Sequence, residues 1–293
     1  MYFPAVYSWY PTGARAPVAV TFHDAIAEHF PDLVFPRLRQ RVFWNAKIWL
    51  AKRNADCITT VSYAAREELS RYLHIDPRRI HVTLEAADPR FRPKNDPALR
   101  ADMRDRLGLD RGMRLLTYVG GMAPHKNLAR LIDAFALALT NDSTRDVMLV
   151  LVGDPGGDGF HSNYAELLGR VEDNPLLQGR VRFTGFIEDD DLATLYSDAW
   201  LVALPSLSEG FGLPAAEAIA CGTPVIAARN GAVAEVVAQA GAFFDPLDVD
   251  DMARVIVELA SDPDRMAALR ACCTERALQL SWEETASQML DIL

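Results

Sequence analysis

The chain has 293 residues, half of them hydrophobic and 24% charged, which is typical of a soluble globular protein large enough for two domains. Its formal net charge of −10 argues against nucleic acid as the main partner, because such proteins usually carry a basic face. No run approaches the roughly 20 apolar residues of a transmembrane helix, and the first residues lack a signal-peptide pattern. The 4 cysteines form no C-x-x-C pair. We therefore expect a cytoplasmic protein.

The N-terminal third reads as a short α/β region. Residues 18–22, 57–61 and 80–84 are strand candidates, and Ser62 is the predicted N-cap of a helix that runs through Tyr72. Residues 88–97 are rich in proline and charge, so we place the interdomain linker there.

From about residue 114 short apolar strands alternate with amphipathic helices. The predicted strands are 115–120, 147–153, 181–186, 201–205, 224–228 and 241–245, and the predicted helices are 127–139, 163–171, 190–199, 215–220, 232–239 and 248–261. Near-continuous apolar strands joined by helices predict a parallel sheet covered on both faces, which is a Rossmann-like domain. Ligands of such domains bind at the carboxyl ends of the strands. Residues 281–293 read as a final capped helix.

The segment SEGFGLPAAEAIACGTPV, residues 208–225, is the most informative part of the sequence. Pro214 suits the first turn of a helix and Gly222 suits its end, so Glu209 is predicted in the preceding loop and Glu217 within the first turn or so. The free backbone amides of residues 210–213 would lie beside both carboxylates. Such a loop suits a ligand with phosphate and hydroxyl groups, for example a nucleotide sugar. Alternatively, both glutamates are surface carboxylates near a helix N-terminus, where acids are favoured.

This string resembles the E-x7-E signature of glycosyltransferase family 4, in which it also follows a strand. Further similar segments are VTFHD at 20–24, ADCITTVS at 55–62, YVGG at 118–121, HKN at 125–127, FTGF at 183–186 and SWEE at 281–284. The resemblance implies the GT-B fold, an α/β architecture of two Rossmann-like parallel-sheet domains that face a cleft. It implies an acceptor-side domain at 1–93, a nucleotide-sugar-binding domain at 94–280, and a C-terminal helix at 281–293 that crosses back toward the first domain. Because the family's N-terminal domain is considerably longer, we expect the N-terminal domain here to be incomplete.

The resemblance also implies roles for individual residues. Lys126 would neutralise the donor diphosphate, Glu209 would orient sugar hydroxyls near the anomeric carbon, and Glu217 would accept hydrogen bonds from the ribose. His23 would position the transferred sugar or act electrostatically. The implied donor-binding set is Gly120, Gly121, Lys126, Phe186, Ile187, Glu209, Gly210, Phe211, Gly212, Leu213 and Glu217, and the implied catalytic set is His23, Lys126 and Glu209. For a lone lysine or histidine the alternatives are a solvated cation and a structural side chain.

Two features concern the charges of the reaction. Many family members carry a second cation where this chain has Gly121 or His125, and a histidine supplies a charge only when protonated. No Asp-x-Asp motif marks a metal anchor, and Asp189–Asp191 read as an N-cap cluster, so we expect no cofactor and no metal. The family retains anomeric configuration, with the leaving phosphate assisting the acceptor. A glycosyl-enzyme on Glu209 ranks second.

Residues 37–53 form a basic, aromatic helix candidate that could touch an anionic membrane or a lipid-linked acceptor. Arg39 and Arg53 fall among its apolar positions, so the faces are not cleanly separated. We therefore expect a core-packing helix, with a weak peripheral membrane contact as the alternative.

The sequence thus predicts a retaining glycosyltransferase that moves a hexose-type sugar from a nucleotide diphosphate sugar to a saccharide or lipid-linked acceptor in polysaccharide biosynthesis. It would be cytoplasmic or peripheral at the inner face of the membrane. The alternative is a catalytically silent remnant or partner subunit that acts by nucleotide binding or association. A GT-B 2-epimerase is a weaker alternative. The sugar, the base, the acceptor and the oligomeric state stay open.

Overall fold

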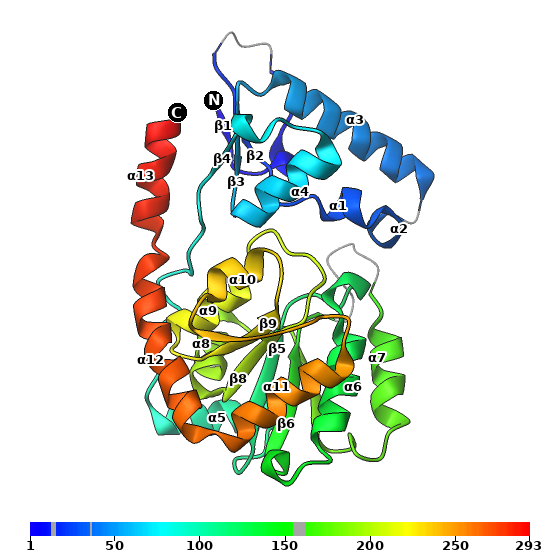
Figure 1. Cartoon of the computed structure of the whole chain (residues 1–293), viewed down its shortest axis with the longest axis vertical. Helices are drawn as coiled ribbons and strands as arrows, with labels where there is room; N and C mark the ends of the chain where they lie inside the picture. The colour runs from blue at the N-terminus through cyan, green and yellow to red at the C-terminus, as the bar shows by residue number, and fades with distance from the viewer. Residues whose placement is uncertain (13–15, 36, 155–161) are drawn as a thin grey trace. The chain divides into compact units, whose positions relative to one another are not determined.

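The computed structural model describes residues 1–12, 16–35, 37–154 and 162–293 (Figure 1). Two compact units make up the chain. Unit 1 contains Met1–Ala86, Ser208–Phe211 and Leu280–Leu293, and unit 2 contains Ala87–Leu207 and Gly212–Gln279. The segment that holds both motif glutamates therefore belongs to both units, with Glu209 in unit 1 and Glu217 in unit 2.

Unit 1 is built on a parallel sheet with the order β1-β2-β3-β4. Its strands are β1 (Tyr2–Phe3), β2 (Ala19–Thr21), β3 (Cys57–Thr60) and β4 (Ile80–Val82). Its helices are α1 (Ile26–His29), α2 (Pro31–Val34), α3 (Leu38–Asn54), α4 (Tyr63–Leu73) and α13 (Trp282–Ile292), with short 3-10 turns at Val6–Ser8 and Pro77–Arg79. The three strands predicted for this region are confirmed. The sequence did not predict β1, because two residues are too short for a periodic pattern.

Serine caps begin two of the unit 1 helices, as predicted. The Ser62 hydroxyl accepts a hydrogen bond from the Ala65 amide at 2.9 Å, and the Ser281 hydroxyl accepts one from the Glu284 amide at 3.2 Å. Each cap satisfies an amide that the first helical turn leaves without a partner. The Thr285 hydroxyl also donates to the Leu84 carbonyl, which ties α13 to the end of β4 within unit 1.

Unit 2 contains a parallel sheet with the order β10-β9-β8-β5-β6-β7. Its strands are β5 (Arg114–Val119), β6 (Val147–Val152), β7 (Val181–Gly185), β8 (Leu201–Leu204), β9 (Val225–Ala228) and β10 (Gly241–Phe244). Its helices are α5 (Pro97–Leu107), α6 (Leu128–Ala138), α7 (Tyr164–Glu172), α8 (Asp189–Asp198), α9 (Leu213–Ala220), α10 (Ala232–Val237), α11 (Val249–Ser261) and α12 (Pro263–Gln279). The strands and helices predicted between 114 and 261 are all present, with ends that differ by one or two residues.

Helices cover both faces of this sheet. α6 packs against α7 and α11, while α9 packs against α8, α10 and α12, and the two groups of helices meet where α11 contacts α12. The central strands β6, β8 and β9 are buried along their whole length. Burial on both faces explains why these strands read as continuous apolar runs rather than as alternating patterns.

Two predictions need correction. Asp189–Asp191 form the first turn of α8, whereas its N-cap is Glu188, which makes no side-chain cap hydrogen bond. Helix α3 is not a core-packing helix over most of its length, since Ile48 and Ala51 are its buried residues, whereas Phe43 is 66% exposed. The arginines among its apolar positions prevent that face from entering an apolar core. No helix within the described ranges is long and apolar enough to cross a bilayer.

Gly241 and Gly169 make a matched test of the packing in unit 2. A Cβ at Gly241 would lie 1.9 Å from the Val225 carbonyl oxygen and 2.6 Å from Val237 Cγ1, whereas one at Gly169, inside α7, meets nothing within 4 Å. We expect Gly241→Ala to destabilise unit 2 by about 2 kcal/mol or more, and Gly169→Ala to stabilise it by about 0.5–1 kcal/mol. Thermal unfolding followed by circular dichroism checks both. Equal melting temperatures for the two variants would contradict this packing.

Candidate functional site

The sheet of unit 2 reverses its strand order between β5 and β8, which lie side by side at its centre (Figure 1). From β5 the chain continues to β6 and β7 on one side, and from β8 it continues to β9 and β10 on the other. The chain leaves β5 and β8 toward opposite halves of the sheet, and open α/β sheets bind ligands at the carboxyl ends of the strands at such a switch point. These two loops carry Gly120, Gly121 and Lys126 on one side and the glutamate segment on the other.

The turn after β5 needs glycine at Gly120 and at the neighbouring Gly153. Gly120 has φ +148°, and a Cβ there would lie 2.8 Å from the Tyr118 hydroxyl oxygen. A Cβ at Gly153, after β6, would lie 2.1 Å from the Gly120 carbonyl oxygen. The Tyr118 hydroxyl donates to the Gly121 carbonyl at 2.6 Å. Larger residues at 120 and 153 are therefore excluded, and the backbone of this turn stays accessible at the edge of the sheet.

Asn127 joins the loops that follow three strands. It has φ +61°, and its side-chain amide donates to the carbonyls of Pro205, after β8, and Pro246, after β10, at 3.0 and 2.7 Å. The Leu207 amide donates to the His125 carbonyl at 2.9 Å. Lys126 lies between these two anchored residues in a 3-10 turn, Pro124–Lys126, and is half-buried. Its backbone is therefore fixed beside the loop after β8.

His125 is buried, with 6% of its surface exposed. It occupies one of the two positions at which many family members carry a second cation for the donor.

The part of the glutamate segment that belongs to unit 1 is held by three contacts. Ser62, which caps α4, also donates to the Gly210 carbonyl at 2.7 Å. The Ser208 hydroxyl donates to the Glu68 carboxylate at 3.1 Å. A Cβ at Gly210 would lie 2.4 Å from the His23 carbonyl oxygen. Gly210 is thus required by a close approach to the chain just after β2, and the half-buried Glu209 lies between two anchored neighbours.

The part that belongs to unit 2 begins α9. Gly212 is the N-cap with φ +96°, and a Cβ there would lie 2.9 Å from Val233 Cγ2. Pro214 lies in the first turn, as predicted. The amides of Gly212 and Leu213 are at the positive end of the helix dipole, so this end of α9 favours an anion. Leu213 is exposed, whereas Phe211, on the unit 1 side, is buried.

Glu217 is held by a residue that the sequence analysis missed. The Tyr196 hydroxyl, in α8, donates to Glu217 Oε2 at 2.9 Å, and Tyr196 is fully buried. Burial raises the pKa of the Glu217 carboxyl, the Tyr196 hydrogen bond opposes that rise, and the charges of Asp189 and Asp88 add to it. The apolar pattern of α8 predicts a buried tyrosine, but only the packing of α8 against α9 shows its partner.

His23 also has a partner that was missed. Its Nε2 lies 3.3 Å from Glu85 Oε1 in unit 1. The hydrogen bond to Glu85 raises the pKa of His23, burial opposes the rise, and the charges of Glu85 and Asp24 add to it. His23 follows strand β2 and Glu85 follows the strand candidate 80–84, so the sequence held a signal that both lie at one edge of the sheet.

Phe186 and Ile187 follow β7, the edge strand of the sheet in unit 2. Phe186 is 70% exposed and Ile187 is buried. The structure therefore groups the predicted residues by unit. Gly120, Gly121, Lys126, Gly212 and Leu213 lie on loops and a helix start in unit 2, Glu217 lies in α9 beyond its first turn, and His23, Glu209, Gly210 and Phe211 lie in unit 1. Over the described part of the chain, no three His, Cys, Asp or Glu side chains are arranged to hold a metal ion.

The raised pKa of Glu217 makes this carboxylate a cost to stability. A carboxyl whose pKa is higher in the folded than in the unfolded chain destabilises the fold above its ordinary value of 4.5, and the penalty fades below that pH. We therefore expect Glu217→Gln to raise the melting temperature at pH 7 by a few degrees, and less at pH 4. The matched control is Glu258→Gln. Arg254 lowers the pKa of Glu258, so this carboxylate stabilises the fold and its loss should lower the melting temperature at pH 7. A lower melting temperature for Glu217→Gln at pH 7 would contradict this electrostatic picture.

Curated relatives of the chain are glycosyltransferases. It is 37% identical over 228 residues to a D-inositol 3-phosphate glycosyltransferase of Rhodococcus opacus (strain B4), covering 77% of this chain and 50% of the relative. It is 30% identical over 272 residues to the O-antigen chain mannosyltransferase B of Escherichia coli, covering 92% of this chain and 68% of the relative. The chain spans about half the length of the first of these.

Solved structures share the fold. Sucrose-phosphate synthase of Thermosynechococcus elongatus superposes with a TM-score of 0.76 at 28% identity, covering 95% of this chain and 67% of that one. Anabaena HepE in complex with UDP and glucose superposes with a TM-score of 0.77 at 24% identity, covering 94% and 71%, and this likeness concerns the fold alone. The predicted GT-B class, two parallel-sheet α/β domains, is confirmed.

Family models account for nearly the whole chain. Residues 1–90 match the model described as Glycosyltransferase Family 4. Residues 100–278 match the model described as Glycosyl transferases group 1, and this segment contains the switch point, Lys126 and the complete E-x7-E string. With the sheet order and the relatives above, these matches show that the chain belongs to the group 1 glycosyl transferases, in glycosyltransferase family 4.

Proposed function

We propose that this chain binds a nucleotide diphosphate sugar and transfers its hexose-type sugar, with retention of configuration, to a saccharide or lipid-linked acceptor. The observation that carries the proposal is the meeting of the Lys126 loop with the loop before α9 at the switch point of unit 2. A cation, a helix N-terminus and a carboxylate held by Tyr196 there match the diphosphate and the ribose of such a donor. The names of the relatives support the reaction class.

The geometry supports a division of work among three groups in unit 2. Lys126 and the amides that begin α9 supply positive charge where the leaving diphosphate develops negative charge. The Tyr196 hydrogen bond occupies Glu217 Oε2, which leaves Oε1 to accept a hydrogen bond from a ribose hydroxyl. Backbone and apolar contacts from Phe186 and Ile187 would hold the base. We propose that transfer requires no metal, since these groups supply the charge that a metal would otherwise supply.

In unit 1 we assign electrostatic work to His23. The Glu85 hydrogen bond raises the pKa of His23 and so favours a cation, which would balance the negative charge of the donor phosphate. The leaving phosphate would assist the acceptor hydroxyl on the retained face. A glycosyl-enzyme on Glu209 is the second candidate, because Glu209 is the carboxylate of the motif that belongs to the same unit as His23. We place the activity in the cytoplasm or at the inner membrane surface.

Nucleotide binding tests the donor site. Lys126→Ala and Glu217→Ala should each weaken the binding of UDP, GDP or ADP, whichever binds, by about 10- to 100-fold, the usual cost of losing a hydrogen bond to a charged group. Titration calorimetry on the whole chain measures this. Arg145→Ala is the control, because Arg145 is an exposed unit 2 arginine that pairs with Asp142.

Product analysis separates the alternatives. A new glycoside supports transfer, a changed sugar nucleotide supports epimerisation, and nucleotide binding without product supports the silent remnant or partner subunit. A folded chain that binds no nucleotide would overturn the donor site itself.

The contact between Tyr196 and Glu217 predicts a specific pH effect. Donation by Tyr196 stabilises the carboxylate, so Tyr196→Phe should raise the pKa of Glu217 further. Because the carboxylate form binds ribose, nucleotide affinity should fall at a higher pH in the variant than in the parent. Titrations between pH 4 and 8 measure the shift. Tyr164→Phe, which alters a tyrosine packed on Phe183, should leave the dependence of nucleotide affinity on pH unchanged. If Tyr196→Phe shows the same pH dependence as the parent, the role assigned to the Tyr196–Glu217 hydrogen bond is wrong.

A further inference from the structure

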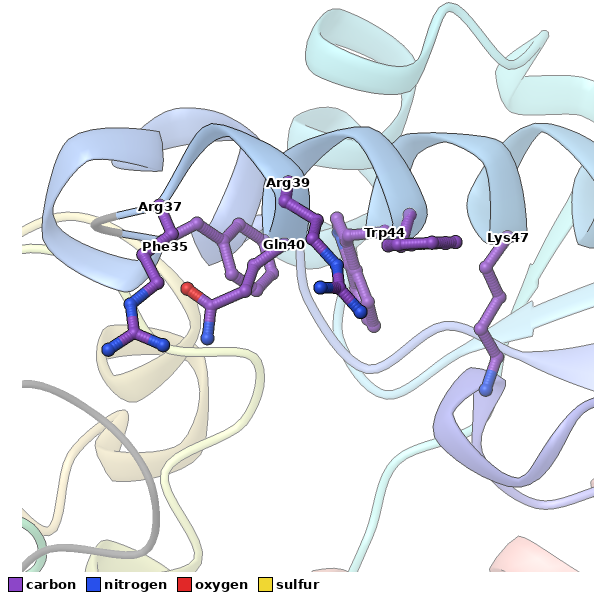
Figure 2. Close-up of a pocket in the computed structure, with 7 residues that line it drawn as sticks. Phe35, Arg37, Arg39, Gln40, Trp44 and Lys47 are labelled. Carbon is purple, nitrogen blue, oxygen red and sulfur yellow. The ribbon is translucent and has the colours of Figure 1, made fainter.

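Unit 1 contains a pocket of about 560 Å³ at the start of α3, and none of the residues assigned above lines it. Six of the residues that line it are Phe35, Arg37, Arg39, Phe43, Trp44 and Lys47. In Figure 2 the side chains of Arg37, Arg39 and Lys47 extend to the same side of the helix, with the rings of Phe35 and Trp44 between them. Cations and aromatic faces thus line one concave site.

The two arginines of the pocket lack the ion pairs that are common elsewhere in this chain. Within the described residues, no carboxylate pairs with Arg37 or Arg39, whereas Arg41, on the same helix, lies 3.4 Å from Asp32. Helix α3 itself contains no acidic residue, although the chain as a whole has a net charge of −10. A cluster of like charges without counterions raises the local potential and attracts an anion.

The start of α3 reinforces this preference. Its N-cap, Arg37, makes no side-chain cap hydrogen bond, and its first turn contains no acidic residue. Helix starts favour negative charge, so a first turn with arginines and no acid is electrostatically unfavourable until an anion lies nearby. Free amides and two guanidinium groups together match the oxygens of a phosphate, which guanidinium binds in a bidentate way.

The aromatic side chains indicate what is attached to the phosphate. Trp44 is fixed, because its indole N–H donates to Glu28 Oε1 at 2.7 Å, and the Phe35 ring lies 5.7 Å from it between centroids. The Arg39 guanidinium lies 5.7 Å from the centroid of the exposed Phe43 ring. Rigid aromatic faces beside cations suit a ligand that carries an apolar ring face as well as a charge.

We propose that this pocket binds the phosphate ester of a sugar or cyclic polyol, with the phosphate on Arg37 and Arg39 and the ring against Phe35, Phe43 and Trp44. Naming this ligand the acceptor rests on the function proposed above, whereas the binding itself does not. The same phosphate chemistry occurs in a soluble ester and in the headgroup of a phosphoinositide lipid.

Calorimetry on the whole chain with myo-inositol 1-phosphate, myo-inositol and inorganic phosphate tests the proposal, and cosedimentation with phosphatidylcholine vesicles with and without phosphatidylinositol tests the lipid source. We expect Arg37→Gln and Arg39→Gln to weaken the ester at least 10-fold. Arg53→Gln is the matched control, because Arg53 is on the same helix, stacks on Trp49 at 5.5 Å and lies outside the pocket. Phe43→Ala should weaken the ester more than inorganic phosphate, and myo-inositol should not bind measurably.

Loss of ester binding in the pocket variants, with Arg53→Gln within twofold of the parent, supports a soluble ester. If the pocket variants instead lose binding to vesicles that contain phosphatidylinositol, and no soluble ester binds, the ligand is a lipid headgroup. No binding of any probe, an equal loss in Arg53→Gln, or a loss in Lys126→Ala but not in Arg39→Gln would overturn the pocket. UDP and GDP titrations of the same samples keep the two proposals separate, because failure of nucleotide binding with intact ester binding rejects the donor site alone.

Discussion

The hydrogen bonds of Asn127 are the constraint on which the donor side of this protein depends. Its amide bonds two carbonyls in the loops after β8 and β10, while its own position after β5 requires a left-handed backbone. Because β5 and β8 are the strands at which the sheet reverses order, these bonds fix the two loops at the switch point, where open α/β sheets bind ligands. The backbone of Lys126 is fixed because its neighbour Asn127 is anchored. A side chain on a fixed backbone loses less conformational entropy when it binds a ligand.

The Glu217 carboxylate lowers the stability of the fold at neutral pH but supplies an acceptor for the proposed ligand. A partly buried carboxylate is unfavourable, and the surrounding charges of Asp189 and Asp88 increase the cost. The Tyr196 hydroxyl reduces that cost and leaves one carboxylate oxygen for a ligand. The same logic applies to His23, where Glu85 favours the charged form against burial. In both units, a charged group of the proposed site is therefore oriented by a neutral or oppositely charged side chain that does not itself need to touch the ligand.

The start of α3 differs from the rest of this acidic chain. Many arginines of unit 2, such as Arg106 with Asp191, are paired with carboxylates, and such pairs carry little net charge. Arg37 and Arg39 instead border an aromatic pocket. The exposed Phe43 is unfavourable for a solvated helix, and a ligand with a ring face would offset that exposure. Unit 1 thus contains the His23–Glu85 pair after β2 and β4 and, separately, the proposed phosphate-binding pocket at the start of α3.

The sequence alone determined the alternation of strands and helices in unit 2, the place of Pro214 in the first turn of α9, the serine caps and the family, because these depend on periodicity and on short local motifs. Tertiary structure decided which side chains meet. Tyr196 and Glu217 are brought together by the packing of α8 on α9, and Asn127 reaches Pro246 across 119 positions of the chain. The exposure of α3 was also decided there, because a helical pattern shows which residues share a face but not whether another element covers it.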